Sequence, residues 1–150
     1  MKAIKKILVP TDFSDHSKQA ARFAIQLAQL LGSEITLCHY YKVQGATGPF
    51  VSIRKIVDAD AHTDMEKMKN ELQAEQDDKL LLDTIVAEAD AVNAIAKKAE
   101  KGNFDLIVMG TKGASGLEKV LLGSVAANVL DRSTTPLLVI PKDVAYSGFG

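Results

Sequence analysis

The chain lacks several features that mark specialised classes of protein. Its 150 residues include one cysteine, Cys38, so no disulfide can form within the chain, which is typical of a reducing compartment. The formal net charge is −1 and gives no reason to expect binding to nucleic acid or to an anionic membrane. No apolar run approaches the roughly 20 residues that span a bilayer, and the N-terminal apolar segment is too short for a signal peptide. We therefore expect a cytoplasmic protein.

Common catalytic motifs are missing as well. The sequence holds no Gly-x4-Gly-Lys-[Ser/Thr] loop, no Gly-x-Gly-x-x-Gly and no Gly-x-Ser-x-Gly. The histidines show no metal-ligand spacing, and His16 and His62 are expected to face solvent. Cys38 and His39 are adjacent in a predicted strand, so they point to opposite faces and form no nucleophile–base pair; Cys38 is expected in the core. No residue suited to orienting the attacking group in phosphoryl transfer is identified, which favours binding over catalysis.

A regular alternation of strand and helix patterns runs through the chain. Short apolar runs predict strands over residues 4–9, 34–41, 82–87, 106–109 and 137–140. Apolar residues at helical spacing predict helices over residues 15–31, about 60–78, 92–101 and 124–132. This order predicts one α/β domain over residues 1–142, with a mostly parallel sheet and helices on both faces. The half-exposed strand 82–87 is expected near a sheet edge, residues 43–59 as a variable connection, and residues 143–150 as a tail.

The stretch most indicative of function is residues 104–126. A buried strand ends at Gly110, further glycines follow at Gly113 and Gly116, and Gly123-Ser124 opens a helix. Glycines allow a ligand to approach the main chain, and a helix N-terminus offers N–H groups and a positive dipole end. The pattern predicts an anion site. In an open parallel sheet, ligands bind at the carboxyl ends of strands where the strand order reverses, and residues 10–12 follow the first strand in the same way.

On these residues the chain resembles the nucleotide-binding branch of the universal stress protein family. The motif is Gly110-x2-Gly113-x9-Gly123-Ser124, supported by residues 9–14 (VPTDFS), 105–110 (DLIVMG) and 136–140 (PLLVI). The resemblance covers nearly the whole chain and fades over residues 42–58. It implies an adenine nucleotide alpha hydrolase-like sheet of order 3-2-1-4-5. It also implies ATP, or ADP or AMP, at the switch point, with Mg²⁺ or Mn²⁺ bound through the phosphates.

The resemblance assigns residues to parts of the ligand and to a dimer. The residues expected on the adenine and ribose side are Pro10, Thr11, Asp12 and Tyr40. Those expected beside the ribose and the phosphates are Met109, Gly110, Lys112 and Gly113. Those expected to receive the phosphate tail through N–H groups and a hydroxyl are Gly123, Ser124, Val125 and Ala126. A homodimer is implied through the last strand, by Leu137, Leu138, Val139 and Ile140, since an unpaired apolar edge invites aggregation.

Two residues depart from the family pattern. Ala126 stands where nucleotide-binding members often have a hydroxyl, which leaves open the preference between ATP and ADP. Tyr40 is bulkier than the usual aliphatic residue and either stacks on the base or narrows the pocket.

Four simpler roles stay open beside the ligand roles. Asp12 and Ser124 also fit as helix caps, the former in competition with Ser14. Lys112 fits equally as a solvated surface lysine. Residues 115–118 have capping-box spacing, which predicts an ordered turn in the glycine loop.

Three functions remain in competition. The first is a homodimeric, nucleotide-binding stress sensor or regulator that is not an enzyme. The second is a slow ATPase or phosphotransferase. The third is a dimeric interaction module that binds no nucleotide, which the departures at Ala126 and Tyr40 favour.

Overall fold

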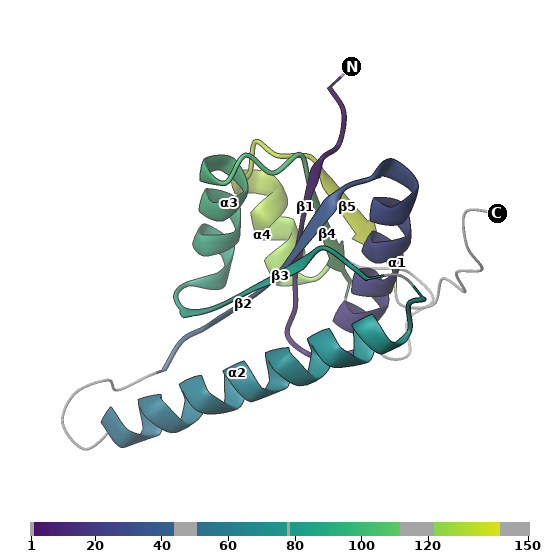
Figure 1. Ribbon diagram of the computed structural model, residues 1–150. Coiled ribbons are helices and arrows are strands. Elements are labelled where there is room, and N and C mark those ends of the chain that lie inside the picture. Colours follow the sequence, from purple (N-terminus) through teal and green to yellow (C-terminus); the bar gives the residue numbers. More distant parts are fainter. Residues whose placement is uncertain (1, 44–50, 78, 112–121, 142–150) are drawn as a thin grey trace.

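The computed structural model describes residues 2–43, 51–77, 79–111 and 122–141, and the structural statements below refer to these residues (Figure 1). The strands are β1 (Lys6–Pro10), β2 (Glu34–Tyr41), β3 (Leu82–Glu88), β4 (Leu106–Gly110) and β5 (Leu137–Ile140). The helices are α1 (Asp15–Leu31), α2 (Val51–Ala74), α3 (Ala91–Lys101) and α4 (Ser124–Arg132). Strand and helix alternate along the chain, as the sequence predicts.

The five strands form one parallel sheet of order β3-β2-β1-β4-β5, which confirms the expected topology. The order reverses between β1 and β4, which pair directly through Ile7 and Leu106. The strand β3 lies at one edge, as its half-exposed pattern predicts, and β5 lies at the other. The carboxyl ends of β1 and β4 therefore open side by side at the switch point.

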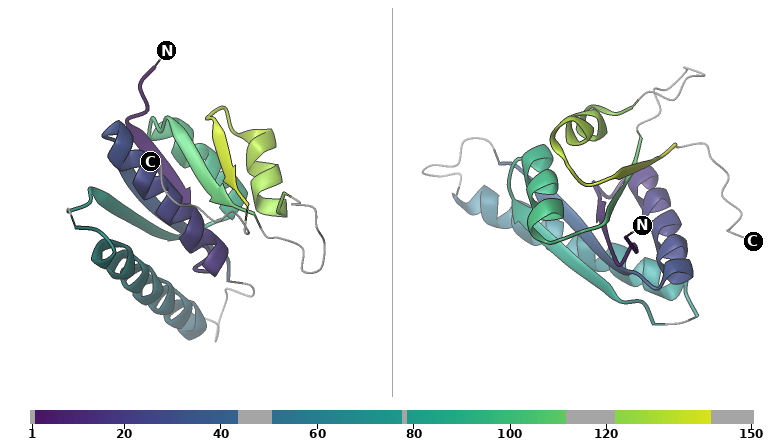
Figure 2. Two further views of the ribbon diagram at one scale, coloured as in Figure 1. Left: turned by 90° about the vertical axis from the view of Figure 1, so that its right-hand side faces the viewer. Right: turned by 90° about the horizontal axis from the view of Figure 1, so that it is seen from above.

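Helices cover both faces of the sheet, α1 and α2 on one side and α3 and α4 on the other (Figures 1 and 2). Each face has its own apolar core. On the α1 and α2 side it includes Val9, Ile25, Leu37, Met65 and Val108. On the α3 and α4 side it includes Leu8, Cys38, Ile95, Met109 and Val129. Because alternate residues of β1, β2 and β4 enter opposite cores, these central strands are apolar along most of their length.

The first helix begins and ends where the sequence predicts. The Ser14 hydroxyl accepts the N–H of Ser17 and is the N-cap of α1. Gly32 adopts a left-handed conformation with φ of 69° after the last turn, and its N–H donates to the Ala28 carbonyl. These contacts satisfy polar groups that a helix leaves exposed at its ends, so they fix the turn between β1 and α1 beside the switch point.

The expected connection over residues 43–59 is wrong in its second half, because α2 already begins at Val51. The same helix ends at Ala74, earlier than the predicted end near residue 78. After Pro49 the sequence contains no glycine or proline through residue 74. Apolar side chains recur at helical spacing through Ile53, Val57, Ala61 and Met65, so one stripe spans the whole helix. The first turns contribute little to the core, and they extend past the sheet (Figure 1).

Two kinds of feature are absent from the described residues. None of the helices there combines the length and the apolar character needed to cross a membrane. No group of three or more histidine, cysteine, aspartate or glutamate side chains converges there as a metal site.

Candidate functional site

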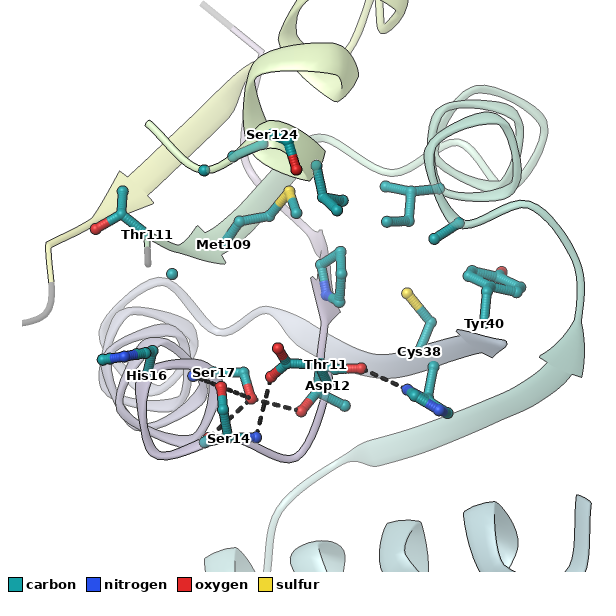
Figure 3. Close-up of a pocket in the computed structure, with 18 residues that line it drawn as sticks. Thr11, Asp12, Ser14, His16, Ser17, Cys38, Tyr40, Met109, Thr111 and Ser124 are labelled. Atoms are coloured by element: carbon teal, nitrogen blue, oxygen red, sulfur yellow. Dashed lines mark hydrogen bonds between the residues drawn. The ribbon is translucent and has the colours of Figure 1, made fainter. Parts of the chain in front are cut away.

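A pocket opens at the switch point, between the carboxyl ends of β1 and β4, and extends over β2 (Figure 3). Its wall combines the β1–α1 turn, the end of β2, the first turns of α3 and α4, and the end of β4. The lining residues that the sequence predicts are Pro10, Thr11, Asp12, Tyr40, Met109, Gly110, Gly123, Ser124, Val125 and Ala126. Those that it does not predict are Ser14, His16, Ser17, Cys38, His39, Ala91, Ile95 and Thr111.

Every predicted site residue that the structure describes therefore lines this one pocket. Lys112 and Gly113 lie outside the described residues, as does the predicted capping box of residues 115–118. Segments separated by about a hundred residues of sequence meet here because the sheet order places β4 beside β1.

The β1–α1 turn presents Asp12 at the pocket. Its Oδ1 accepts the N–H of Ser14 at 3.0 Å, and the side chain is exposed. Since Ser14 is the N-cap of α1, Asp12 is not the cap of that helix. Thr11 has a different role, because its buried hydroxyl lies 2.9 Å from the Ser17 Oγ and accepts the N–H of Phe13. The Thr11 side chain therefore stabilises the turn, whereas Asp12 faces the opening.

One end of the pocket is apolar. Cys38, Ile95 and Met109 are buried and belong to the same core cluster, against which the half-buried Tyr40 also packs. Burial raises the pKa of the Cys38 thiol and raises the pKa of Tyr40 to about 12. Both groups are therefore protonated at neutral pH, and the thiol is not a nucleophile. This end offers flat apolar contacts and one phenol hydroxyl.

The other end is the N-terminus of α4. The N-cap residue is Gly123, which makes no side-chain capping hydrogen bond, so the predicted N-cap role of Ser124 is wrong. The first main-chain hydrogen bond of this helix runs from Ala127 to the Gly123 carbonyl, which leaves the N–H groups of residues 124–126 without a partner inside the helix. Ser124 is exposed beside them. N–H groups and a hydroxyl at a helix N-terminus suit an anion.

The pocket contains a buried hydroxyl with no hydrogen-bond partner among the residues that the structure describes. Thr111 follows β4, and its N–H donates to the Ile140 carbonyl at 3.1 Å. Its side chain is 1% exposed, and Oγ1 has no hydrogen-bond partner among the described residues. Such a group costs about 1–3 kcal/mol relative to a satisfied one. Nothing in the local sequence identifies Thr111 beyond its place directly after the predicted strand.

His16 also differs from the sequence expectation. It is partly buried in the first turn of α1 and lines the pocket, rather than facing solvent as predicted. Its main chain packs against Gly110: a Cβ at residue 110 would lie 2.8 Å from the His16 carbonyl oxygen. The strand β4 thus needs a glycine where α1 crosses it, and this contact brings His16 to the site.

The charge of the lining is sparse. Among the lining residues that the structure describes there is no lysine or arginine, and Asp12 is the one carboxylate. The positive character at the α4 end comes from main-chain N–H groups. Asp12 is a hydrogen-bond acceptor, so it suits a ligand hydroxyl rather than a phosphate.

Sequence comparison assigns the chain to a known family. A model of the universal stress protein family matches residues 3–141. The chain belongs to the universal stress protein family. The resemblance drawn from the glycine motif is therefore confirmed over nearly the whole chain.

Individual universal stress proteins give the same result. The protein MJ0531 of Methanocaldococcus jannaschii is 35% identical over 143 residues, covering 92% of this chain and 82% of the relative. The structure of UspA from Lactobacillus plantarum superposes with a TM-score of 0.77 at 25% identity, covering 93% of this chain and 99% of that one. A universal stress protein solved in complex with cAMP has a TM-score of 0.70 at 25% identity, covering 93% and 98% of the two chains.

Proposed function

We propose that this universal stress protein binds an adenine nucleotide in the switch-point pocket. The observation that carries the proposal is that three kinds of surface face one pocket. Cys38 and Tyr40 lie on one side of it, the Asp12 carboxylate on a second, and the N-terminus of α4 with Ser124 across the pocket from Asp12 (Figure 3). A nucleoside phosphate has three matching parts: a flat base, a sugar with hydroxyls, and an anionic tail.

The apolar end fits a purine base. Cys38, Ile95 and Met109 offer buried, uncharged walls, and Tyr40 adds an aromatic ring from the end of β2 (Figure 3). Stacking of a base on an aromatic ring contributes about 1–3 kcal/mol. The Tyr40 phenol is protonated at neutral pH and supplies a donor to ring nitrogens.

The anionic end fits a short phosphate tail. The first N–H groups of α4 and the Ser124 hydroxyl hold one phosphate well, whereas Ala126 is 1% exposed and has no hydroxyl to offer a further one. The described lining also lacks a lysine or arginine. We therefore propose AMP or ADP as readily as ATP, with Mg²⁺ or Mn²⁺ held through the phosphates where the tail is long. The relative solved with cAMP supports a monophosphate ligand.

We further propose a homodimer through β5. The two edges of the sheet differ in charge: β3 carries exposed Asp83 and Glu88, while β5 is the uncharged, partly exposed run Leu137–Ile140. Charged residues on an edge strand discourage pairing with another sheet. The contrast favours β5 as the edge that pairs with a second copy.

The role that fits these features is a cytoplasmic sensor or regulator without fast turnover. Phosphoryl transfer needs groups that stabilise charge on the transferring phosphate and a group that orients the attacking atom. The described lining supplies main-chain N–H groups and one carboxylate. Steady phosphate release from ATP that is lost in Asp12→Ala, with nucleotide affinity retained, would instead establish the slow ATPase.

Calorimetric titration tests the proposed binding. Purified protein is first denatured and refolded to release any copurified nucleotide, which mass spectrometry identifies. Titration with AMP, cAMP, and ATP with and without Mg²⁺ should show binding, with GMP as the base control. Asp12→Ala should weaken AMP binding about tenfold, whereas Asp15→Ala, an exposed aspartate of α1 outside the lining, should not. No adenine nucleotide binding at millimolar ligand would leave the dimeric interaction module as the function.

A further inference from the structure

The turn that carries Asp12 has an unusual main chain. Phe13, the next residue, has φ of 65°, in the left-handed region that residues other than glycine rarely adopt. A side chain in this conformation persists only where its surroundings hold it. The position of Asp12 therefore depends on what holds its two neighbours, Thr11 and Phe13.

His39 of β2 holds both neighbours. Its Nδ1 lies 2.7 Å from the Thr11 carbonyl oxygen, and its ring centroid lies 4.4 Å from that of Phe13 at an interplanar angle of 42°. Because a carbonyl oxygen can only accept, Nδ1 must carry the proton and donate it. One side chain thus fixes the main chain before Asp12 and the aromatic ring after it.

The other polar groups of Thr11 are already engaged. Its N–H donates to the Cys38 carbonyl at 2.8 Å, and its hydroxyl contacts Ser17 and accepts the Phe13 N–H. The Thr11 carbonyl is the remaining polar group, and His39 holds it. The main chain on both sides of the Thr11 Cα is therefore bonded to residues of β2. Loss of the His39 contact would release the one main-chain group that leads directly to Asp12.

The His39 ring lies away from the apolar end of the pocket. Alternate residues of a strand point to opposite faces, and Cys38 and Tyr40 belong to the α3 and α4 side. Phe13, which the His39 ring contacts, packs against the core on the α1 and α2 side. His39 is among the residues that line the pocket, but its ring contacts Phe13 on the opposite side of β2 from Cys38 and Tyr40. We therefore expect it to act on the ligand through the turn rather than by contact with the base.

We propose that His39 is a positioning residue of the nucleotide site: by holding the Thr11 carbonyl and the Phe13 ring, it fixes the Asp12 carboxylate where the ribose hydroxyls bind. This inference rests on the proposed nucleotide binding. It identifies the ribose hydroxyls as the part of the ligand that His39 controls.

Three substitutions of His39 distinguish the effect of its Nδ1–H donor from the effect of its ring. His39→Phe keeps a ring and loses the donor. His39→Asn keeps an N–H donor near the place of Nδ1, whereas His39→Gln carries its donor toward the place of Nε2. The Asn and Gln variants form a matched pair, so the test survives even if the Phe variant fails to fold. Thermal melts establish which variants are folded.

The readout is the ratio of dissociation constants for 2′,3′-dideoxy-AMP and AMP, which a loss of general stability would not change. We expect a ratio of about ten in the parent protein, since a hydrogen bond to a charged group is strong, and about three in Asp12→Asn, whose amide oxygen accepts more weakly. His39→Gln and His39→Phe should lower the ratio toward one, and His39→Asn should keep most of it.

The outcomes distinguish the inference from the function on which it rests. A ratio that falls in Asp12→Asn but is unchanged in His39→Gln and His39→Phe overturns the positioning role and leaves nucleotide binding intact. An equal fall in His39→Asn and His39→Gln also overturns it, because the donor would then not matter. Absence of AMP binding by the parent protein overturns the proposed function and the inference together.

Discussion

Gly110 at the end of β4 packs directly against the main chain of His16 in α1. A Cβ at residue 110 would lie 2.8 Å from the His16 carbonyl oxygen and 3.1 Å from its carbonyl carbon. The motif glycine thus has a packing reason of its own: it allows the first turn of α1 to cross the end of the strand. This contact also sets how closely the Asp12 turn approaches β4.

Gly110→Ala should therefore destabilise the folded protein. The obstacle is a main-chain carbonyl and cannot rotate away, so α1 or β4 must shift, at a cost of about 1–3 kcal/mol. Denaturant unfolding of the free protein measures this change. The His16→Ala, Gly110→Ala double variant should show no rescue, because the clash does not involve the imidazole. Rescue by His16→Ala would contradict the main-chain explanation.

Much of the fold could be predicted because β1 and β4, at the centre of the sheet, are short apolar runs that end at proline and at glycine. The alternation of these runs with amphipathic helices predicts a parallel sheet. The strand order was predicted from the family resemblance, which the glycine motif carries. The prediction failed at Val51, where the first turns of α2 extend beyond the sheet. Ile56 lies off the apolar stripe of α2, and both Ile53 and Ile56 are exposed, so the sequence of these turns lacks the clear separation of apolar and polar faces that marks a packed helix.

The candidate site was predictable where the signal was local. Asp12 comes soon after a strand whose end Pro10 marks, and Ser124 begins a helix whose start Gly123 marks. His16 and Ile95 were missed, because their place in the pocket depends on how α1 and α3 cross the sheet. The main-chain reason for Gly110 is likewise a tertiary contact, which glycine spacing alone cannot distinguish from ligand approach.

Thr111→Val should have opposite effects on stability and on binding. The substitution keeps the shape of the side chain and removes a buried hydroxyl that has no partner among the described residues. The free protein should keep its stability or gain about 1 kcal/mol in unfolding free energy. If the hydroxyl contacts the ligand, AMP affinity should fall at the same time. A clear loss of stability in the free protein would show that the hydroxyl already has a partner.

Substitution of Tyr40 decides between stacking and narrowing of the pocket. If the ring stacks on the base, Tyr40→Ala should weaken AMP binding about tenfold. Tyr40→Phe keeps the ring and loses only the phenol donor, so it should weaken AMP binding less, by about threefold. Calorimetric titration measures both. A gain of affinity in Tyr40→Ala would mean that the phenol restricts the pocket instead.

Val139→Pro tests the β5 dimer. The Ile107 N–H donates to the Pro136 carbonyl and the Thr111 N–H to the Ile140 carbonyl, so even-numbered residues of β5 direct their main-chain groups toward β4. The N–H of Val139 therefore points outward, and proline removes it without breaking the sheet. We expect a dimer in the parent protein and a monomer in Val139→Pro by light scattering. A folded variant that stays dimeric would place the interface elsewhere.

Asp105 should make the fold sensitive to acid. Its Oδ2 accepts the N–H of Lys5 at 2.9 Å and of Lys6 at 3.1 Å, and the Lys2 ammonium lies 3.2 Å from Oδ1. The hydrogen bond from Lys5, with those from Lys6 and Lys2, lowers the pKa of this carboxyl in the folded protein, against an opposing effect of burial. The stabilisation is therefore present at pH values above the pKa that Asp105 has in the unfolded chain, which is about 4. It is lost as the pH falls through the lowered folded value.

Melting curves of the parent protein and of Asp105→Asn measure this effect. The variant should melt at a lower temperature at neutral pH, because the amide carries no charge and accepts more weakly from the two N–H groups. The difference should narrow as the pH falls below about 4, where the parent protein binds a proton at Asp105 as it unfolds. Asp83→Asn, at an exposed aspartate of β3, serves as the control and should leave both the midpoint and its pH dependence near those of the parent. A gap between the parent and Asp105→Asn that stays constant from neutral to acid pH would show that the carboxyl acts through its shape and not through its charge.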